Sequence, residues 1–523
     1  MSSHLRNISQ SASVIALATV VSRILGFLRD VVIAFSLGAG PMADAFFVAF
    51  RVPNLLRRLF AEGSMTMAFI PVFTRVRQES GLEQAFVLAR SVMIWLLAIL
   101  GVLTILAMLG AKPLTFAVAA GFNFKDDPAV LELTVLLLRI CFPYILFISG
   151  VALCMGILNS LGHFFAPALA PCVLNIVLIL VALSAYWLGV RIPVALAVGV
   201  LVAGLGQWLL QQPFLKARGF SWRGPISLRQ RGVRRMGRLM LPTVFGAAVY
   251  QLNILVNTNL ASFLPHGSIS YLYYADRLVQ FPLGVFGAAI STAALPSLSA
   301  LASRKEAQGF SQAVEDTIGL NLFISLPAAA GLIALREPII STLFGHGAFS
   351  NASVQATALA LIGYAVGLPA FCCVRALVSA FYALEDTKTP VRVASVCLVI
   401  NAGLGLSLMG PLNHFGLALA VSLASWANTL GLGFWLGRSH RKWFLWKKSH
   451  SLMLLMSLLI GLCGHFGAGL GRASLLLIPV LAGGYVLAGR AFRIKEADML
   501  IMSLQPLGRK LGLGSERGKR TGP

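Results

Sequence analysis

The chain has 523 residues, of which 58% are hydrophobic and 11% charged, and its mean hydropathy is +0.83. A soluble domain is about 45–50% apolar and about 25% charged, so the composition excludes a soluble globular protein and predicts an all-α, polytopic membrane protein. The net charge of +24 would suggest nucleic-acid binding in a soluble chain, but basic loops that set membrane orientation account for it here, so no nucleic-acid partner is expected.

A membrane-spanning helix needs about 20 mostly apolar residues. On that template the chain contains fourteen candidate spans: 11–36, 42–74, 88–118, 131–158, 165–189, 192–215, 238–264, 268–300, 312–336, 353–382, 391–409, 412–437, 450–470 and 474–494. The first, second and eighth spans carry several charges. We therefore expect a plain hydropathy scan to miss or shorten these three.

The loops between the predicted spans alternate between two kinds. One set is basic, whereas the opposite set, with segments such as GVRIP and PLNHF, is nearly free of Lys and Arg. The positive-inside rule places the basic set and both chain termini in the cytoplasm. The longest and most basic loop, 216–238, is interpreted as a solvated linker, with attachment to the inner leaflet as the alternative.

A weak internal repeat divides the chain. AFIPVF and AALPSL align Pro71 with Pro296, and a second pair of segments aligns Pro167 with Pro390, at offsets of 225 and 223 residues. Two matches at nearly one offset predict two six-helix lobes around a central cavity, followed by two C-terminal helices. The predicted divisions are 1–215 for the N-terminal lobe, 216–237 for the interlobe linker, 238–437 for the C-terminal lobe and 438–523 for the extra helices and basic tail.

No motif for catalysis or for a cofactor is present in the sequence. A phosphate-binding loop, a zinc-protease motif, a Cys/His metal spacing and a nucleophile elbow are all missing, so we expect a protein that is not an enzyme and has no metal centre. The seven cysteines are interpreted as small core residues: Cys141, Cys154, Cys172, Cys372, Cys373, Cys397 and Cys463.

The first two predicted spans carry charges that are costly at membrane depth. On an ideal helix Arg23 and Asp30 share one face, and a second shared face carries Asp44, Arg51, Arg58 and Glu62. Asn54 and Arg57 lie on an adjacent face. Too few acids are nearby to pair with Arg23, Arg29 and Arg57, so we expect these three to bind an anion, whereas Asp30 and Glu62 could equally brace the lobe through ion pairs.

The eighth span contributes one comparable feature, Asp276 and Arg277 within YLYYADRLVQFPLG. A cavity between the lobes would then be positive, which suits an anionic headgroup better than a cationic drug.

Four segments together resemble one known family: SRILGFLRD, ADAFFVAFRVPNLLRRLFAEG, YYADRL and SAFYALEDTKTP. They resemble the MurJ (MviN) family of lipid II flippases, within the multidrug/oligosaccharidyl-lipid/polysaccharide exporter superfamily. The resemblance implies fourteen spans and flipping of lipid II, the undecaprenyl-diphosphate-linked peptidoglycan precursor, across the bacterial inner membrane by alternating access. It places the required charges on Arg23, Arg29, Asp44, Arg57 and Arg277, with weaker support for Asn54, Arg58 and Glu62.

We therefore expect the diphosphate to bind Arg23, Arg29, Arg57 and Arg277, and Asp44 to act as a gate or salt-bridge partner, with Asp30, Glu62 and Asp276 in similar roles. The energy source is expected to be an ion gradient or the membrane potential, with the site of any coupling monovalent ion unassigned. The partners expected are lipid II, membrane lipid and peptidoglycan synthesis proteins. The alternatives are an exporter of another polyprenyl-linked oligosaccharide and a scaffold for cell-wall synthesis that transports nothing.

Overall fold

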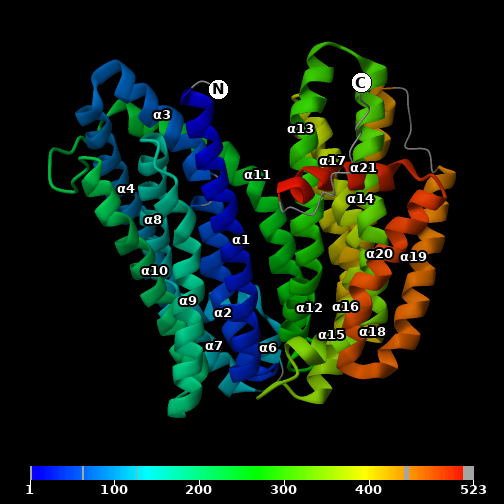
Figure 1. Ribbon diagram of the computed structural model, residues 1–523. Coiled ribbons are helices and arrows are strands. Elements are labelled where there is room, and N and C mark those ends of the chain that lie inside the picture. The colour runs from blue at the N-terminus through cyan, green and yellow to red at the C-terminus, as the bar shows by residue number, and fades with distance from the viewer. Residues whose placement is uncertain (1–2, 62–63, 125–126, 441–446, 511–523) are drawn as a thin grey trace. The chain divides into compact units, whose positions relative to one another are not determined.

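The computed structural model describes residues 3–61, 64–124, 127–440 and 447–510, and within these ranges it contains helices and no strands (Figure 1). Helices are expected of apolar segments in a bilayer, because a helix satisfies its own backbone hydrogen bonds where no water is available. The all-α membrane fold predicted from composition is thereby confirmed.

The elements of the first half of the chain are α1 (Ser3–Leu37), α2 (Pro41–Leu56), η1 (Arg57–Ala61), α3 (Ser64–Ser80), α4 (Leu82–Leu109), α5 (Ala111–Val118), α6 (Gly121–Phe124), α7 (Pro128–Cys141), α8 (Tyr144–Ser160), α9 (Phe165–Leu188), α10 (Ile192–Ala217) and α11 (Arg231–Ser262). Those of the second half are α12 (Ser268–Pro282), η2 (Leu283–Gly287), α13 (Ala288–Ser303), α14 (Ala307–Ala334), α15 (Arg336–Leu343), α16 (Asn351–Ala365), α17 (Leu368–Ala383), α18 (Lys388–His440), α19 (Lys448–Gly467), η3 (Ala468–Leu476), α20 (Leu477–Ala491) and α21 (Lys495–Lys510).

Eight helical runs in the described ranges are long and apolar enough to cross a membrane, or up to nine if the bent pair α16 and α17 forms one span. Neither the first nor the second predicted span is among these runs, as expected from their charges, whereas the run Ser268–Ser303 retains the eighth span. Its charged pair lies near one end, and the remainder is apolar. Two runs, Lys388–Arg438 and Lys448–Ala491, each cover two predicted spans and contain residues with non-helical dihedrals, Asn413 and Gly471. The predicted count of fourteen is consistent with these helices.

Short π-helical segments interrupt two of the charged helices. The π-helix η1 separates α2 from α3, and η2 separates α12 from α13, with first residues Arg57 and Leu283 lying 226 positions apart. This spacing is close to the two offsets found in the sequence and supports the internal repeat. A π turn takes in an extra residue and changes the helical phase. Of the four residues predicted to share one helical face, only Asp44 and Arg51 lie in the same uninterrupted α-helix. Arg58 lies in η1, and Glu62 lies outside the described residues.

The chain packs into two compact units. The first contains the described residues up to Tyr274 together with Leu343–Thr357 and Gly405–Leu417, and the second contains Ala275–Thr342, Ala358–Leu404 and the described residues from Ala418 onward. Phe69 and Phe73 of α3 lie in the core of the first unit, and Phe310 and Phe323 of α14 lie in that of the second. The units follow packing, whereas the predicted lobes follow the number of spans, so the lobe boundaries remain a prediction.

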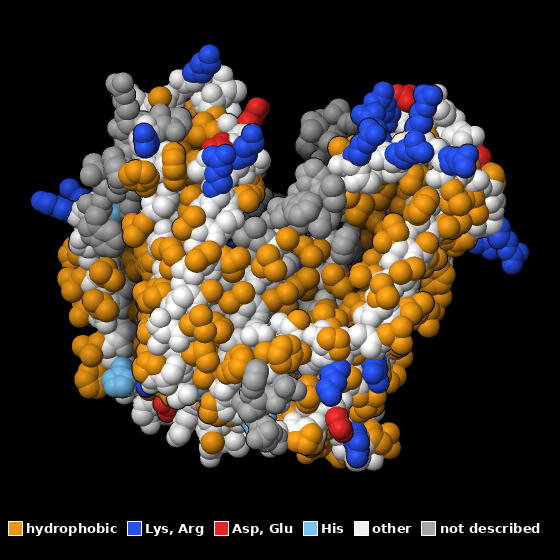
Figure 2. All heavy atoms as spheres, turned by 180° about the vertical axis from the view of Figure 1, so that it is seen from behind, with side chains coloured by type: hydrophobic (Ala, Val, Ile, Leu, Met, Phe, Trp, Pro, Cys, Tyr) orange, Lys and Arg blue, Asp and Glu red, His pale blue; other side chains and the backbone are white. Residues whose placement is uncertain are grey.

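The helix flanks carry large exposed apolar side chains, among them Leu109, Trp187 and Leu188. Figure 2 shows hydrophobic side chains over the flanks and Lys and Arg side chains gathered towards helix ends, which is the pattern of a surface that faces lipid. Six of the cysteines are buried, as predicted, but Cys463 is exposed on α19, so its interpretation as a core residue is wrong. Cysteine is apolar enough to face lipid as well as core.

Candidate functional site

The charged cluster of the first unit is centred on an ion pair between Arg29 and Asp30 in α1, so the expectation that Arg29 has no acid to pair with is wrong, because the next residue along the helix supplies one. Arg29 donates from Nε and Nη2 to Asp30 Oδ1 at 3.1 and 2.7 Å, and from Nη1 to Asn175 Oδ1 at 3.1 Å. Asn175 comes from α9, and its Nδ2 donates to the backbone oxygen of Ser22 at 3.1 Å. Asp30 is only 2% exposed. A charge so deeply buried is stable only when it is paired and hydrogen-bonded, which this network provides.

Tyr273, in the second turn of α12, adds a further donor to Asp30. Its hydroxyl donates to Asp30 Oδ1 at 3.0 Å, and its ring stacks on Phe47 of α2 with the ring centroids 4.0 Å apart. Tyr274 lies edge-on to the same phenylalanine at 5.6 Å. Aromatic rings around an ion pair lower the local dielectric constant and strengthen the attraction between its charges. The side chain of Arg29 as a whole is 13% exposed.

Asp44 lies in the first turn of α2 and holds the start of α12. Its Oδ2 accepts from the backbone N–H of Gly267 at 2.6 Å, and its Oδ1 accepts from the N–H of Ser270 at 2.8 Å and from the Ser270 hydroxyl. The first N–H groups of a helix have no partner within the helix, and a carboxylate is the best neutraliser of their partial positive charge. Asp44 is 2% exposed and therefore has a structural role in capping α12, in addition to the gating role predicted for it.

The remaining charges of α2 and η1 are held by polar neighbours. Arg51 donates to the Thr258 hydroxyl of α11, and Arg57 donates from Nε to Asn54 Oδ1 at 2.9 Å. The second contact joins Arg57 to a residue three positions earlier in the chain, and the supporting role of Asn54 stays a prediction. Arg58 is half-buried in η1.

Three further predicted residues lie in α1 and α12. Arg23 is exposed on α1, about two turns before Arg29. Asp276 and Arg277 are in α12 but belong to the second unit, where Asp276 accepts from Gln280 Nε2 at 3.4 Å and Arg277 is half-buried. The described hydrogen bonds thus link Arg29 to Asp30 and Arg57 to Asn54.

Sequence reasoning missed Asn175, Ser270 and Tyr273. Asn175 is the single polar residue in the apolar run CVLNIVLIL, and a lone buried amide of this kind is a sign of a specific polar contact. Tyr273 lies inside the YYADRL segment, of which only the charged residues were singled out. No spacing in the sequence could have indicated Ser270, because its partner Asp44 is 226 positions away.

The LEDTKTP part of the fourth segment behind the family resemblance also has a structural role. Asp386, outside the spans, accepts from the N–H groups of Lys388 and Thr389 at 2.9 and 3.0 Å and from the Thr389 hydroxyl at 2.6 Å. These contacts cap the start of α18. The hydroxyl and the backbone N–H of Thr389 hold the pKa of the Asp386 carboxyl below its ordinary value, since they stabilise the charged form.

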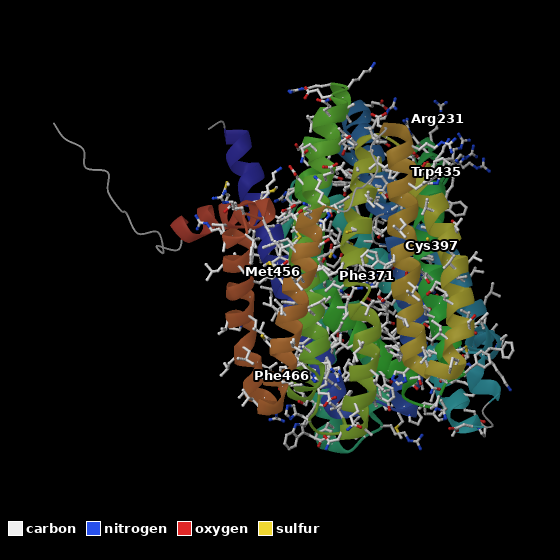
Figure 3. The ribbon with its side chains drawn as sticks, turned by 90° about the vertical axis from the view of Figure 1, so that its right-hand side faces the viewer. Arg231, Phe371, Cys397, Trp435, Met456 and Phe466 are labelled. Carbon is white, nitrogen blue, oxygen red and sulfur yellow. The ribbon has the colours of Figure 1, made fainter. Side chains whose placement is uncertain are left out.

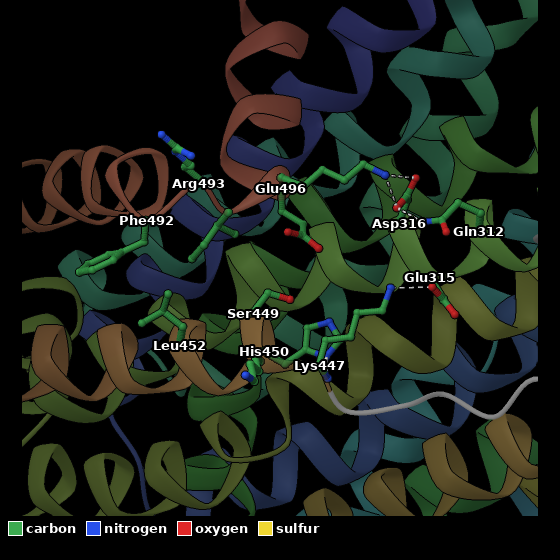
Figure 4. Close-up of a pocket in the computed structure, with 13 residues that line it drawn as sticks. Gln312, Glu315, Asp316, Lys447, Ser449, His450, Leu452, Phe492, Arg493 and Glu496 are labelled. Atoms are coloured by element: carbon green, nitrogen blue, oxygen red, sulfur yellow. Dashed lines mark hydrogen bonds and ion pairs between the residues drawn. The ribbon is translucent and has the colours of Figure 1, made fainter.

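A pocket of about 350 Å³ lies in the second unit, between α14, the start of α19 and the turn from α20 to α21 (Figure 4). Lys447 Nζ contacts Glu315 at 2.6 Å, and Lys495 Nζ contacts the two oxygens of Asp316 at 2.7 and 2.8 Å. Figure 4 shows Lys447 reaching across to Glu315 of α14. The ion pairs fasten α21 and the entry to α19 onto α14, and none of the predicted site residues lines this pocket.

Comparison with known proteins identifies relatives over most of the chain. The family model described as "Lipid II flippase MurJ" matches residues 33–480. A Vibrio cholerae protein named "Probable lipid II flippase MurJ" is 38% identical over 432 residues, which cover 81% of this chain and 82% of that protein. A solved structure, "Lipid II flippase MurJ, inward closed conformation", matches with a TM-score of 0.73 at 28% identity and covers 89% of this chain and 99% of its own.

The fold also occurs in drug transporters. An inward-facing multidrug resistance transporter of the MATE family, within the MOP superfamily, matches with a TM-score of 0.67 at 17% identity, over 82% of this chain and 95% of that chain. At this identity the likeness concerns the fold alone.

Proposed function

Because this chain belongs to the MurJ family, we propose that it is a lipid II flippase, which moves the undecaprenyl-diphosphate-linked peptidoglycan precursor from the inner to the outer leaflet of the bacterial cytoplasmic membrane. The observation that carries this proposal is the match of the family model over residues 33–480. The apolar helices and the arginines placed within them support it, because the substrate joins a lipid tail to an anionic headgroup.

The diphosphate would bind Arg23, Arg29, Arg57 and Arg277. A planar guanidinium can donate two parallel hydrogen bonds to phosphate oxygens, which an ammonium cannot do. The anchoring of Arg29 by Asp30 and Asn175, and of Arg57 by Asn54, supports this role. A side chain that is already held loses less conformational entropy when it binds a ligand.

Transport would proceed by alternating access and would use an ion gradient or the membrane potential, with no covalent chemistry on the substrate. Moving one elementary charge across 100 mV is worth about 2.3 kcal/mol, which is enough to bias the orientation of a cationic site. As the protein alternates between its inward-facing and outward-facing conformations, four acidic residues would change their ion-pair partners: Asp44, Asp30, Glu62 and Asp276. The basic loops and both termini would face the cytoplasm.

The test is complementation in a bacterium depleted of its own flippase, with lipid II accessible at the outer face as the measurement. The intact chain should restore accessibility. Arg29→Ala should lower it by about tenfold or more, because a charge-assisted contact is worth about 1.5–3 kcal/mol. Arg139→Ala is the matched control, since that arginine is exposed on α7 and bonds only a backbone oxygen, Met108 O, among its described contacts.

If Arg29→Ala and the intact chain restore accessibility equally at equal expression, the assigned anion site is wrong. A correctly inserted intact chain that restores nothing would instead favour the exporter of another lipid-linked oligosaccharide or the cell-wall scaffold.

A further inference from the structure

The basic segment between α10 and α11 is fastened to α4. Arg90 of α4 is 5% exposed and donates from Nη1 to the backbone oxygens of Ser221 and Arg223 at 3.3 and 3.2 Å, while its Nη2 pairs with Glu83. Further along α4, the Ser91 hydroxyl accepts from the Ser227 N–H at 3.0 Å. Buried charge-assisted contacts of this kind hold a backbone firmly, so the segment is an ordered loop.

Aromatic contacts complete the attachment. Phe220 is 3% exposed in the core of the first unit, where its ring packs edge-on against Phe86 of α4. Trp222 donates from its indole nitrogen to Gln212 of α10 at 2.6 Å. Trp95 of α4 donates in the same way to the Leu228 backbone oxygen at 3.2 Å. The loop is therefore tied to α4 and α10 from its beginning to its end.

All the basic side chains of this region are exposed. We call them the basic platform: Lys216, Arg218, Arg223, Arg229, Arg231, Arg234, Arg235 and Arg238. The last four recur at the i, i+3, i+4 and i+7 positions of α11 and so form one helical face. The opposite face of the same turns packs inward, because a Cβ at Gly232 would meet Leu88 at 2.8 Å and because Met236 is 4% exposed. Figure 3 shows Arg231 near an end of the helices.

The platform has no acidic residue of its own to balance its charge. The sequence contains no Asp or Glu between Glu132 and Asp276. Like charges spaced three and four positions apart on a helix repel each other, and the start of a helix already carries partial positive charge. The four arginines on one face at the start of α11 therefore repel one another and destabilise this end of the helix when no anion is bound. An anion from outside the protein would relieve the repulsion.

Exposed apolar side chains beside the platform indicate that the anion would lie at the membrane surface. Ile226 and Leu228 of the loop are 48% and 49% exposed, and Trp95, which holds the loop, is 43% exposed. The neighbouring turns of α4 expose Ile94 and Leu97, so this side of α4 has the composition of a lipid-facing surface. A rigid loop with cations and exposed apolar side chains on a lipid-facing helix matches the border between headgroups and acyl chains.

We propose that the basic platform is a docking surface for the anionic phospholipids of the adjoining leaflet. The arginines would contact lipid phosphates, and Ile226 and Leu228 would enter the acyl region. Arg90 is the positioning residue that holds the loop at this depth. The proposal does not depend on the flippase assignment, because any occupant of this membrane would meet the same lipids.

The test places a nitroxide label at Ile226→Cys in the full chain with Cys463→Ser, since the other six cysteines are buried. The protein is reconstituted in phosphatidylcholine vesicles with or without phosphatidylglycerol. Collision of the label with oxygen, which prefers lipid, is compared with collision with a water-soluble nickel complex. Phosphatidylglycerol should raise the oxygen-to-nickel ratio several-fold, and 1 M salt should reverse this because the screening length falls to about 3 Å.

The variant R231Q/R234Q/R235Q/R238Q should lose the response to phosphatidylglycerol. The variant R304Q/K305Q/K388Q/R392Q, which removes four exposed charges from the second unit, should keep it. A label that stays equally open to nickel in both vesicle types would show a solvated linker and overturn the proposal. It would also be overturned if the first variant kept the response or if the second lost it equally.

Discussion

Asp30 shows at the scale of single residues how a charge survives within a span. One oxygen accepts from Arg29 and from the Tyr273 hydroxyl, and burial makes each of these donors expensive to remove. Tyr273→Phe keeps the stacking on Phe47 but removes one donor. We expect it to lower the free energy of unfolding by about 1–3 kcal/mol, seen as a lower melting temperature in detergent.

Tyr186→Phe is the control for that substitution. Tyr186 is 40% exposed on α9 and packs its ring against Phe35 at 4.9 Å, so loss of its hydroxyl should change the melting temperature little. Equal melting temperatures for wild type and Tyr273→Phe would mean that the hydroxyl does not stabilise Asp30.

At the scale of secondary-structure elements, α6 packs against the end of α11 in the first unit through a close backbone contact. Gly121 of α6 meets the end of α11 so closely that a Cβ would lie 2.3 Å from the backbone of Ser262 and Phe263, and its N–H donates to the Ser262 hydroxyl at 2.9 Å. Gly121→Ala should destabilise the protein by about 1–3 kcal/mol, because backbone atoms cannot move aside as a side chain can. Thermal unfolding followed by helical circular dichroism would measure this.

Gly101→Ala supplies the comparison at the same scale. Gly101 lies in α4 with no atom within 4 Å of its added Cβ, and alanine is the better helix former by about 1 kcal/mol. This variant should be as stable as wild type or slightly more stable. Destabilisation of both variants to the same extent would contradict the proposed α6–α11 contact.

The distribution of charge predicts the orientation of the whole molecule in the membrane. The loops of one set carry most of the Lys and Arg that produce the net charge of +24, and the positive-inside rule puts them in the cytoplasm. Alkaline phosphatase, which is active only outside the cytoplasm, should therefore be inactive when fused after Pro523 and active when fused after Gly189, in the loop between α9 and α10. Activity of the first fusion, or inactivity of the second at equal expression, would reverse the predicted orientation.

The sequence by itself determined the membrane class, the all-helical fold and the family, because hydrophobicity, helix length and the PNLLRR segment are local properties that each stretch carries alone. It also singled out the charges that lie within the spans, since a charge in an apolar run stands out whatever surrounds it. It could not indicate how those charges are satisfied. Asn175 lies 146 positions from Arg29, and Ser270 lies 226 positions from Asp44.

Only the tertiary structure decided these partners, the π-helical change of phase between Arg51 and Arg58, and the attachment of the basic loop by Arg90. Each depends on segments that meet through packing, and packing is a property of the folded chain rather than of any stretch within it.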